Sequence, residues 1–190
     1  MLSPWALPLQ AQIGGKTYDL HADFRDVLEV MGYLQDPALP EFIRWQVALG
    51  LFFKQEVAPE HSREAMAYLA WFLTGGNPEG DQPGPKLLDW EQDAAAIVSD
   101  INRIAGQEIR ALPFLHWWTF LSWFHGIGQG QVSVLVSIRD KRRRGQKLEG
   151  WEQEFYSQNK QQVDLPPRLT AAEEAERARL KQLLNQHTES

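Results

Sequence analysis

The sequence contains no cysteine among its 190 residues. Disulfide bonds and thiol chemistry are therefore excluded, and a structural zinc site is disfavoured because such sites usually rely on cysteine thiolates. The chain also lacks a long apolar run, since its most apolar stretch, residues 112–124, is too short for a membrane span and contains His116. Pro4 and Pro8 interrupt the region where a secretory signal would need an apolar helix. We therefore expect a soluble, cytoplasmic protein.

Catalytic and cofactor-binding signatures are absent as well. The sequence carries no phosphate-binding glycine loop with its lysine, no dinucleotide-binding glycine pattern, no zinc-protease motif and no nucleophile elbow. His116 and His125 fall on one side of a predicted helix, but their neighbours are aromatic and supply no further metal ligands. The carboxylates from Asp89 to Asp93 fit a helix start, where they stabilise the positive end of the helix dipole. These patterns predict no enzyme activity, no cofactor and no metal site.

Charge is unevenly distributed along this acidic chain, whose formal net charge is −6. Six of the nine residues from 139 to 147 are basic, and within that segment Asp140 alone opposes them. A basic cluster can bind phosphates, so a nucleic-acid-binding regulator that uses residues 139–147 is one alternative. The cluster is short and no aromatic residues alternate with its basic residues. We therefore favour protein binding over nucleic-acid binding. The same cluster, opposite an acidic body, also suggests head-to-tail self-association.

The N-terminal part of the chain is predicted to form a small hairpin followed by helices. Gly14-Gly15 accepts the positive φ angles of a two-residue turn and separates two short strands, which gives a hairpin over about residues 10–20. Asp23 is a good helix N-cap and precedes apolar residues at helical spacing. The helices expected next begin at Pro37, Pro59 and Asp89, and the last two of these end at Gly75 and Gly106.

Tryptophan is unusually frequent, with eight residues. Residues 114–125 are apolar on almost all sides and are predicted to form the most buried helix. Large aromatic side chains are also enriched at binding hot spots. The candidate partner-binding residues are therefore three tryptophans of this segment and three arginines of the basic cluster, namely Trp117, Trp118, Trp123, Arg142, Arg143 and Arg144.

Residues 132–138 leave two interpretations open. Their β-branched residues alternate with serine as in a strand, yet apolar residues also recur there at helical spacing. We favour a helix because the neighbouring segments are all helical. A further helix is expected over residues 149–163, and Thr170 with Glu173 forms a capping-box pattern for a last one.

The complete pattern predicts an all-α fold. We expect a helical domain of about six to seven helices over residues 1–165, with the β-hairpin near its N-terminus. Residues 166–190 are expected to form a C-terminal helical extension. This extension contains few large apolar residues, which indicates an arm rather than a part of the core.

Four short motifs occur together along the chain. The first is Ala22-Asp23-Phe24-Arg25 after Tyr18, and the second is Asp89-Trp90-Glu91-Gln92-Asp93 followed by Ala96-Ile97. The third is His116-Trp117-Trp118-Thr119-Phe120, and the fourth is Ile138-Arg139. Together, in this order, they resemble the bacteriophage "gene product fifteen" family of long-tailed phages and prophages, over residues 10–160.

The resemblance implies a role in tail morphogenesis, with a tail assembly chaperone as the leading function. Genes of this family lie between those of the tail tube protein and the tape measure protein, so these two proteins are the implied partners. A tape measure protein is a long helix with an apolar stripe, so its chaperone needs exposed apolar or aromatic surface and repeated copies. The implied location is the cytoplasm of the host bacterium. The alternative is a structural subunit of the phage particle, and the resemblance carries over no catalytic residue.

Charge reversal tests the expected self-association. Replacing Arg142, Arg143 and Arg144 by glutamate should weaken it, because the basic cluster would no longer attract the acidic surface of a second copy. Analytical ultracentrifugation measures the oligomer mass of both proteins. An unchanged mass would rule out a role of this cluster in self-association.

Overall fold

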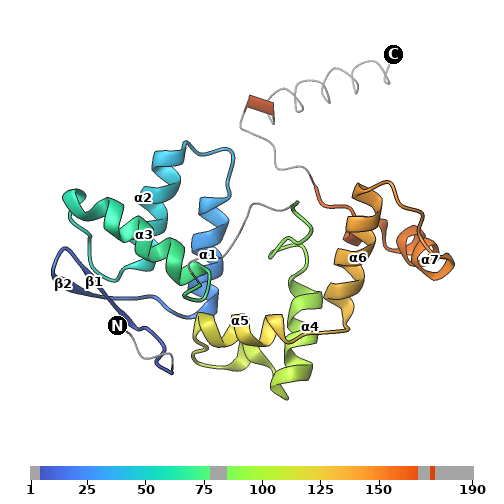
Figure 1. Ribbon diagram of the computed structural model, residues 1–190, viewed down its shortest axis with the longest axis horizontal. Coiled ribbons are helices and arrows are strands. Elements are labelled where there is room, and N and C mark those ends of the chain that lie inside the picture. The colour runs from blue at the N-terminus through green and yellow to red at the C-terminus, as the bar shows by residue number, and fades with distance from the viewer. Residues whose placement is uncertain (1–4, 78–84, 167–171, 174–190) are drawn as a thin grey trace, which may run out of the picture.

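We describe the fold from a computed structural model of the chain (Figure 1). The structure describes residues 5–77, 85–166 and 172–173. Within these residues the chain forms eight α-helices, two short 3-10 helices and one two-stranded antiparallel sheet. This architecture confirms the predicted all-α fold with a small N-terminal hairpin. The helix predicted from Thr170 lies outside the described residues except for residues 172–173, which are helical.

The hairpin consists of β1 (Gln10–Ile13) and β2 (Lys16–Asp19), joined by Gly14-Gly15 as predicted. Both glycines have positive φ angles, +56° and +77°. Gly14 also faces the His61 ring, which lies only 2.3 Å from where a Cβ atom would be. An isolated hairpin is marginally stable in water. This one is stabilised by burial of three apolar side chains, Ala11, Ile13 and Tyr18.

Three α-helices and a 3-10 turn pack with the hairpin and form what we call the N-terminal lobe, residues 5–77. They are α1 (Phe24–Leu34), α2 (Glu41–Phe52), η1 (Pro59–His61) and α3 (Ser62–Leu73). α1 begins where predicted, because the Asp23 carboxylate accepts a hydrogen bond from the N–H of Arg25. α2 begins later than predicted, because Asp36 stabilises a turn and Pro40 takes the N-cap position.

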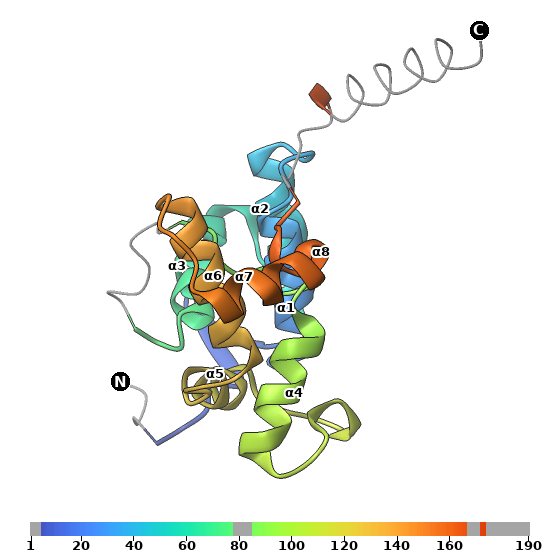
Figure 2. The same ribbon diagram turned by 90° about the vertical axis from the view of Figure 1, so that its right-hand side faces the viewer.

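The C-terminal lobe, residues 85–166, contains five α-helices and a second 3-10 turn (Figure 2). Residues 132–138 lie within one helix, which confirms the helical interpretation of that stretch. The helix predicted over residues 149–163 is instead divided at Asn159. In the described part of the chain, no helix is both long and apolar enough to cross a membrane. The elements are α4 (Ala94–Ala105), η2 (Ile109–Ala111), α5 (Trp117–His125), α6 (Gln131–Arg143), α7 (Gly150–Gln158) and α8 (Lys160–Val163).

α5 joins the two lobes, because it contacts α1 on one side and α4 on the other (Figure 1). Phe24 of α1 and Phe120 of α5 stack with ring centroids 4.8 Å apart. Beside this pair the backbone forms a short antiparallel bridge. The N–H of Phe24 donates to the carbonyl of Leu115 at 2.9 Å, and the N–H of Trp117 donates to the carbonyl of Ala22 at 2.9 Å. α5 therefore begins at Trp117, later than predicted, because the residues before it are extended.

The Asp23 carboxylate fixes this junction. It accepts hydrogen bonds from the N–H of Leu115 at 2.8 Å and from Nε of Arg25 at 2.7 Å. Burial alone would raise the pKa of Asp23, but the hydrogen bonds from Arg25 and Leu115 outweigh burial and lower that pKa. Arg25 also donates to the carbonyl of Leu112 at 3.1 Å, so the first motif binds the backbone that leads into the third.

His116 secures the same junction through both ring nitrogens. Its Nδ1 accepts the N–H of Trp118 at 3.0 Å, so the proton lies on Nε2, which donates to the carbonyl of Pro8 at 3.0 Å. The ring is buried, and burial lowers the pKa of His116 below 6.5. A neutral histidine therefore ties the N-terminal segment to the first turn of α5.

The lowered pKa of His116 should make stability depend on pH. The unfolded chain binds more protons than the folded chain once the pH falls below about 6.5, so the free energy of unfolding should decrease there. His116→Asn keeps an acceptor at the N-cap but removes the titrating ring, so its stability should vary less over this range. Urea unfolding of both proteins between about pH 8 and pH 5 measures the difference, since the other histidines are common to both. Parallel pH profiles would contradict the role assigned to His116.

Candidate partner-binding surface

α2 presents an apolar stripe that is open to solvent. Phe42, Trp45 and Leu49 recur at helical spacing and line a groove of about 970 Å³, which we call the α2 groove. Phe42 is 69% exposed, whereas Trp45 and Leu49 are partly buried. The buried Phe53 lines the same groove at the end of α2. From Phe42 to Phe53 the stripe covers about three helical turns, or roughly 16 Å.

The segment between α2 and α3 forms the opposite wall of the α2 groove. Val57 and Pro59 contribute apolar atoms to it, and Met66 of α3 also lines the groove. Hydrogen bonds to the hairpin hold this wall in place. The N–H of Asp19 donates to Oε1 of Gln55 at 2.9 Å, and Nε2 of Gln55 donates to Oδ2 of Asp19 at 3.0 Å. The groove is therefore built on the fixed backbone of β2.

A second hollow, of about 740 Å³, adjoins the α2 groove. Leu7, Leu9 and Phe114 line it, and they are 49%, 54% and 50% exposed. Lys54 lines both hollows. We call the two hollows together the apolar track. Four of the eight large apolar side chains that are exposed among the described residues line one or other of these hollows, which meet at Lys54.

Except for Phe114, the residues of the apolar track belong to the N-terminal lobe, which is acidic. Residues 5–77 include nine aspartate or glutamate residues and five lysine or arginine residues. Glu41 and Glu56 line the α2 groove, and Lys54 is the one basic residue among its lining residues. A partner with apolar contact residues and positive charge beside them would complement this surface.

The tryptophans predicted to bind a partner lie mainly inside the protein. Trp117 is 1% exposed, and its Nε1 donates to the carbonyl of Leu73 at 3.1 Å. Nε1 of Trp118 donates to the carbonyl of Phe72 at 2.9 Å. Trp123 packs partly buried against the core. These indole groups connect α3 with α5 or complete the core, and their role in partner binding stays a prediction.

The basic cluster of residues 139–147 is largely paired within its own chain. Little positive charge therefore remains for phosphate groups or for a second copy. Reversing the charges of its arginines would also place like charges together inside one chain, so the self-association test requires a parallel measurement of folding stability. The ion pairs are Lys141 with Glu152, Arg142 with Asp164, and Arg143 and Arg144 with Asp140.

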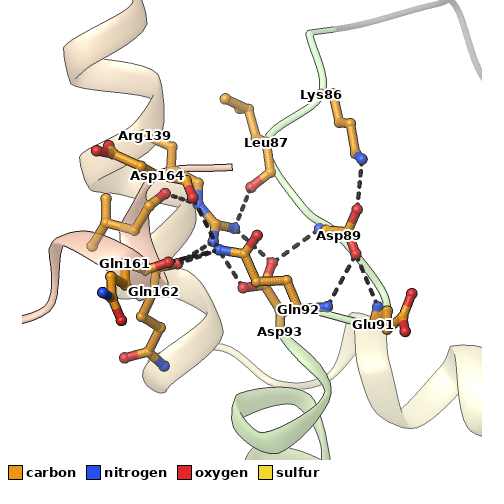
Figure 3. A network of polar contacts seen from close by, with 11 residues as sticks. Lys86, Leu87, Asp89, Glu91, Gln92, Asp93, Arg139, Gln161, Gln162 and Asp164 are labelled. Carbon is orange, nitrogen blue, oxygen red and sulfur yellow. Dashed lines mark hydrogen bonds and ion pairs between the residues drawn. The ribbon is translucent and has the colours of Figure 1, made fainter. Parts of the chain in front are cut away.

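Arg139 is the member of this cluster that is buried (Figure 3). Its Nη1 and Nη2 lie 2.6 Å and 2.8 Å from the two carboxylate oxygens of Asp93. Its other contacts reach backbone carbonyls, those of Val163 at 2.7 Å, Gln162 at 2.8 Å and Leu87 at 2.9 Å. One guanidinium therefore joins α6 to the start of α4 and to the end of α8.

Gln92 binds the same C-terminal segment (Figure 3). Its Nε2 donates to the carbonyls of Gln162 at 2.9 Å and Asp164 at 3.1 Å. Asp89 accepts the N–H of Gln92 at 3.0 Å, while the N–H of Asp89 donates to Oδ2 of Asp93 at 2.9 Å. Asp89 therefore caps this segment, and Asp93 rather than Gln92 returns the second hydrogen bond.

The four sequence motifs thus meet in two pairs. The first contacts the third at the junction of the lobes, and the second contacts the fourth through the buried ion pair. The family model described as Bacteriophage Gp15 protein matches residues 6–165. The chain belongs to this family. The match confirms the resemblance and extends to the segment that Arg139 and Gln92 bind. No curated protein and no solved structure matches the chain significantly.

The α2 groove is the part of this surface that sequence patterns did not identify. The buried face of α2 is made by Ala48 and Phe52, while Phe42 faces solvent. The sequence did contain a signal for an exposed apolar face. Apolar residues occur on almost all sides of α2, which is more than its one buried face requires.

Among the described residues, no group of three or more histidine, aspartate and glutamate side chains is placed to hold a metal ion. The arrangement is suited to non-covalent binding of an apolar partner.

Breaking the buried ion pair should be costly. Asp93→Asn leaves Arg139 without a compensating charge, so the free energy of unfolding should fall by about 3–5 kcal/mol. Asp140→Asn is the matched control, because its partners Arg143 and Arg144 are largely exposed, and it should lower stability much less. Urea unfolding compares both variants with the original chain. Equal effects of the two substitutions would contradict a special contribution of the buried pair.

Proposed function

We propose that this Gp15 family protein is a tail assembly chaperone, which binds the tape measure protein and recruits tail tube subunits during tail construction. The observation that carries the proposal is the apolar track, which leaves Phe42, Leu7, Leu9 and Phe114 exposed together. Exposed apolar side chains that line a groove are suited to contact with another protein. Family membership supplies the phage context.

The α2 groove is short compared with a tape measure helix, so one such helix would offer many binding sites in a row. A tape measure helix rises about 1.5 Å per residue, so one groove of roughly three turns would cover only about eleven residues. Several copies would therefore bind along one rod, and weak individual sites would add to a stable coat. Weak individual sites also allow the copies to be displaced when tube subunits take their place.

The other two candidate functions have less support from the surface. A nucleic-acid-binding regulator would need free positive charge, whereas the cations around Arg139 and Arg142 are paired with carboxylates of the same chain. A structural subunit of the particle would also bind other proteins, so it differs from a chaperone in remaining with the finished tail. The experiment below separates these two.

Co-expression tests the chaperone proposal. The tagged protein is produced with the tape measure protein of the same phage, and the complex is purified and its mass measured by native mass spectrometry. We expect several copies to co-purify with each tape measure chain and to keep it in the supernatant. A soluble coiled coil of similar length is the control and should not co-purify. Failure to bind the tape measure, together with presence of the protein in purified particles, would favour a structural subunit.

A further inference from the structure

We infer that the α2 groove binds an amphipathic helix that carries basic residues beside its apolar stripe. This inference rests on the proposed function and adds the binding site and the chemistry of the bound segment. It follows from three observations: the spacing of the apolar residues, the fixed walls of the groove and the acidic residues beside it.

The spacing of the groove residues matches that of a bound helix. Phe42, Trp45 and Leu49 lie along one side of α2 over about two turns. An amphipathic helix presents its own apolar residues at i, i+3, i+4 and i+7, so its stripe can lie against this side of α2. Phe42, which is 69% exposed, would gain the most burial from such a contact. It is therefore the expected anchor of the interface.

The walls of the groove are fixed before a partner arrives. Leu20 and Phe53 form a bridge between the end of β2 and the end of α2. The N–H of Lys54 donates to the carbonyl of Asp19 at 2.9 Å, and Gln55 binds Asp19 through its side chain. Binding therefore requires little ordering of the backbone, which reduces the entropic cost of association.

The charges beside the groove select the flanks of the bound helix. Glu41 is the first residue of α2, and Glu56 follows the end of this helix. Both residues line the groove and are exposed. Lysine or arginine residues one turn from the apolar stripe would meet these carboxylates, whereas acidic residues would be repelled. The surplus of acidic residues over residues 5–77 adds a longer-range attraction for the same ligand.

A second copy of this chain fits the groove less well. Its exposed aromatic residue in the C-terminal lobe, Trp151, could supply an apolar contact. The nearby cations Lys141, Arg142 and Arg143 are already paired with carboxylates of their own chain, so they offer little charge to Glu41 and Glu56. The observations therefore favour a separate helical partner.

Two synthetic helical peptides test the charge preference directly. They share one leucine stripe at i, i+3, i+4 and i+7, and they carry either lysine or glutamate at the flanking positions. Fluorescence anisotropy with the full chain should show the lysine peptide binding at least about tenfold more tightly at low salt, with a smaller difference at high salt. Equal affinity for the two peptides, or no binding of either, would overturn the inference.

Matched variants test the position of the site. Phe42→Ser should weaken binding of the lysine peptide at least about fivefold, whereas Trp151→Ser, an exposed aromatic outside the groove, should leave it within about twofold. Glu41→Lys with Glu56→Lys should abolish the preference for lysine, and Glu154→Lys is the control. All five positions are exposed, so urea unfolding should show little change in stability. Equal losses for Phe42→Ser and Trp151→Ser would overturn the assignment to the groove.

Two further outcomes separate this inference from the proposed function. If the tape measure protein co-purifies equally well with the original chain and with Phe42→Ser, the groove assignment is wrong and the chaperone proposal stands. If Phe42→Ser instead lowers the oligomer mass of the protein alone while neither peptide binds, a second copy occupies the groove and the inference is wrong. Loss of tape measure binding in Phe42→Ser but not in Trp151→Ser supports both.

Discussion

The contact of residues 22–24 with residues 115–117 determines how the two lobes sit together. Its hydrogen bonds and the Asp23 carboxylate place the start of α5 against the start of α1. His116 then holds the carbonyl of Pro8, and this places Leu7 and Leu9 beside Phe114. The second hollow of the apolar track is therefore a consequence of the junction. The junction thus adds to the hold of the hairpin on this segment, in which the N–H of Leu20 donates to the carbonyl of Leu9 at 3.0 Å.

The parts of the fold that were predicted correctly depend on neighbours in the sequence. The Gly14-Gly15 turn and the Asp23 N-cap are local signals, and both appear as expected. The late start of α5 and the division at Asn159 depend on contacts between distant segments, so no local pattern contains them. The same holds for the attachment of α8, because the Gln92 side chain binds the carbonyl of Gln162.

The surroundings of the candidate site residues could not be predicted from the sequence for the same reason. Tryptophan was selected for its size, which suits a core as well as an interface, and Trp117 is in the core. The arginines were selected for their charge, but the carboxylate that pairs with Arg142 lies at Asp164, far along the chain. In both cases the decisive partner is brought near only by folding. The basic cluster of the C-terminal lobe is thus largely paired within the chain, while Phe42, Glu41 and Glu56 of the N-terminal lobe are exposed.

Arg139 and Gln92 hold the end of the C-terminal lobe through backbone carbonyls rather than through side chains. Every residue type carries the same carbonyl group, so the exposed side chains in this segment are under little constraint from the attachment. The donors are constrained, because a lysine lacks the planar fork that lets Arg139 bind several oxygens at once. Substitutions of the exposed side chains in this segment should therefore leave its attachment to the lobe intact as long as Arg139 and Gln92 are kept.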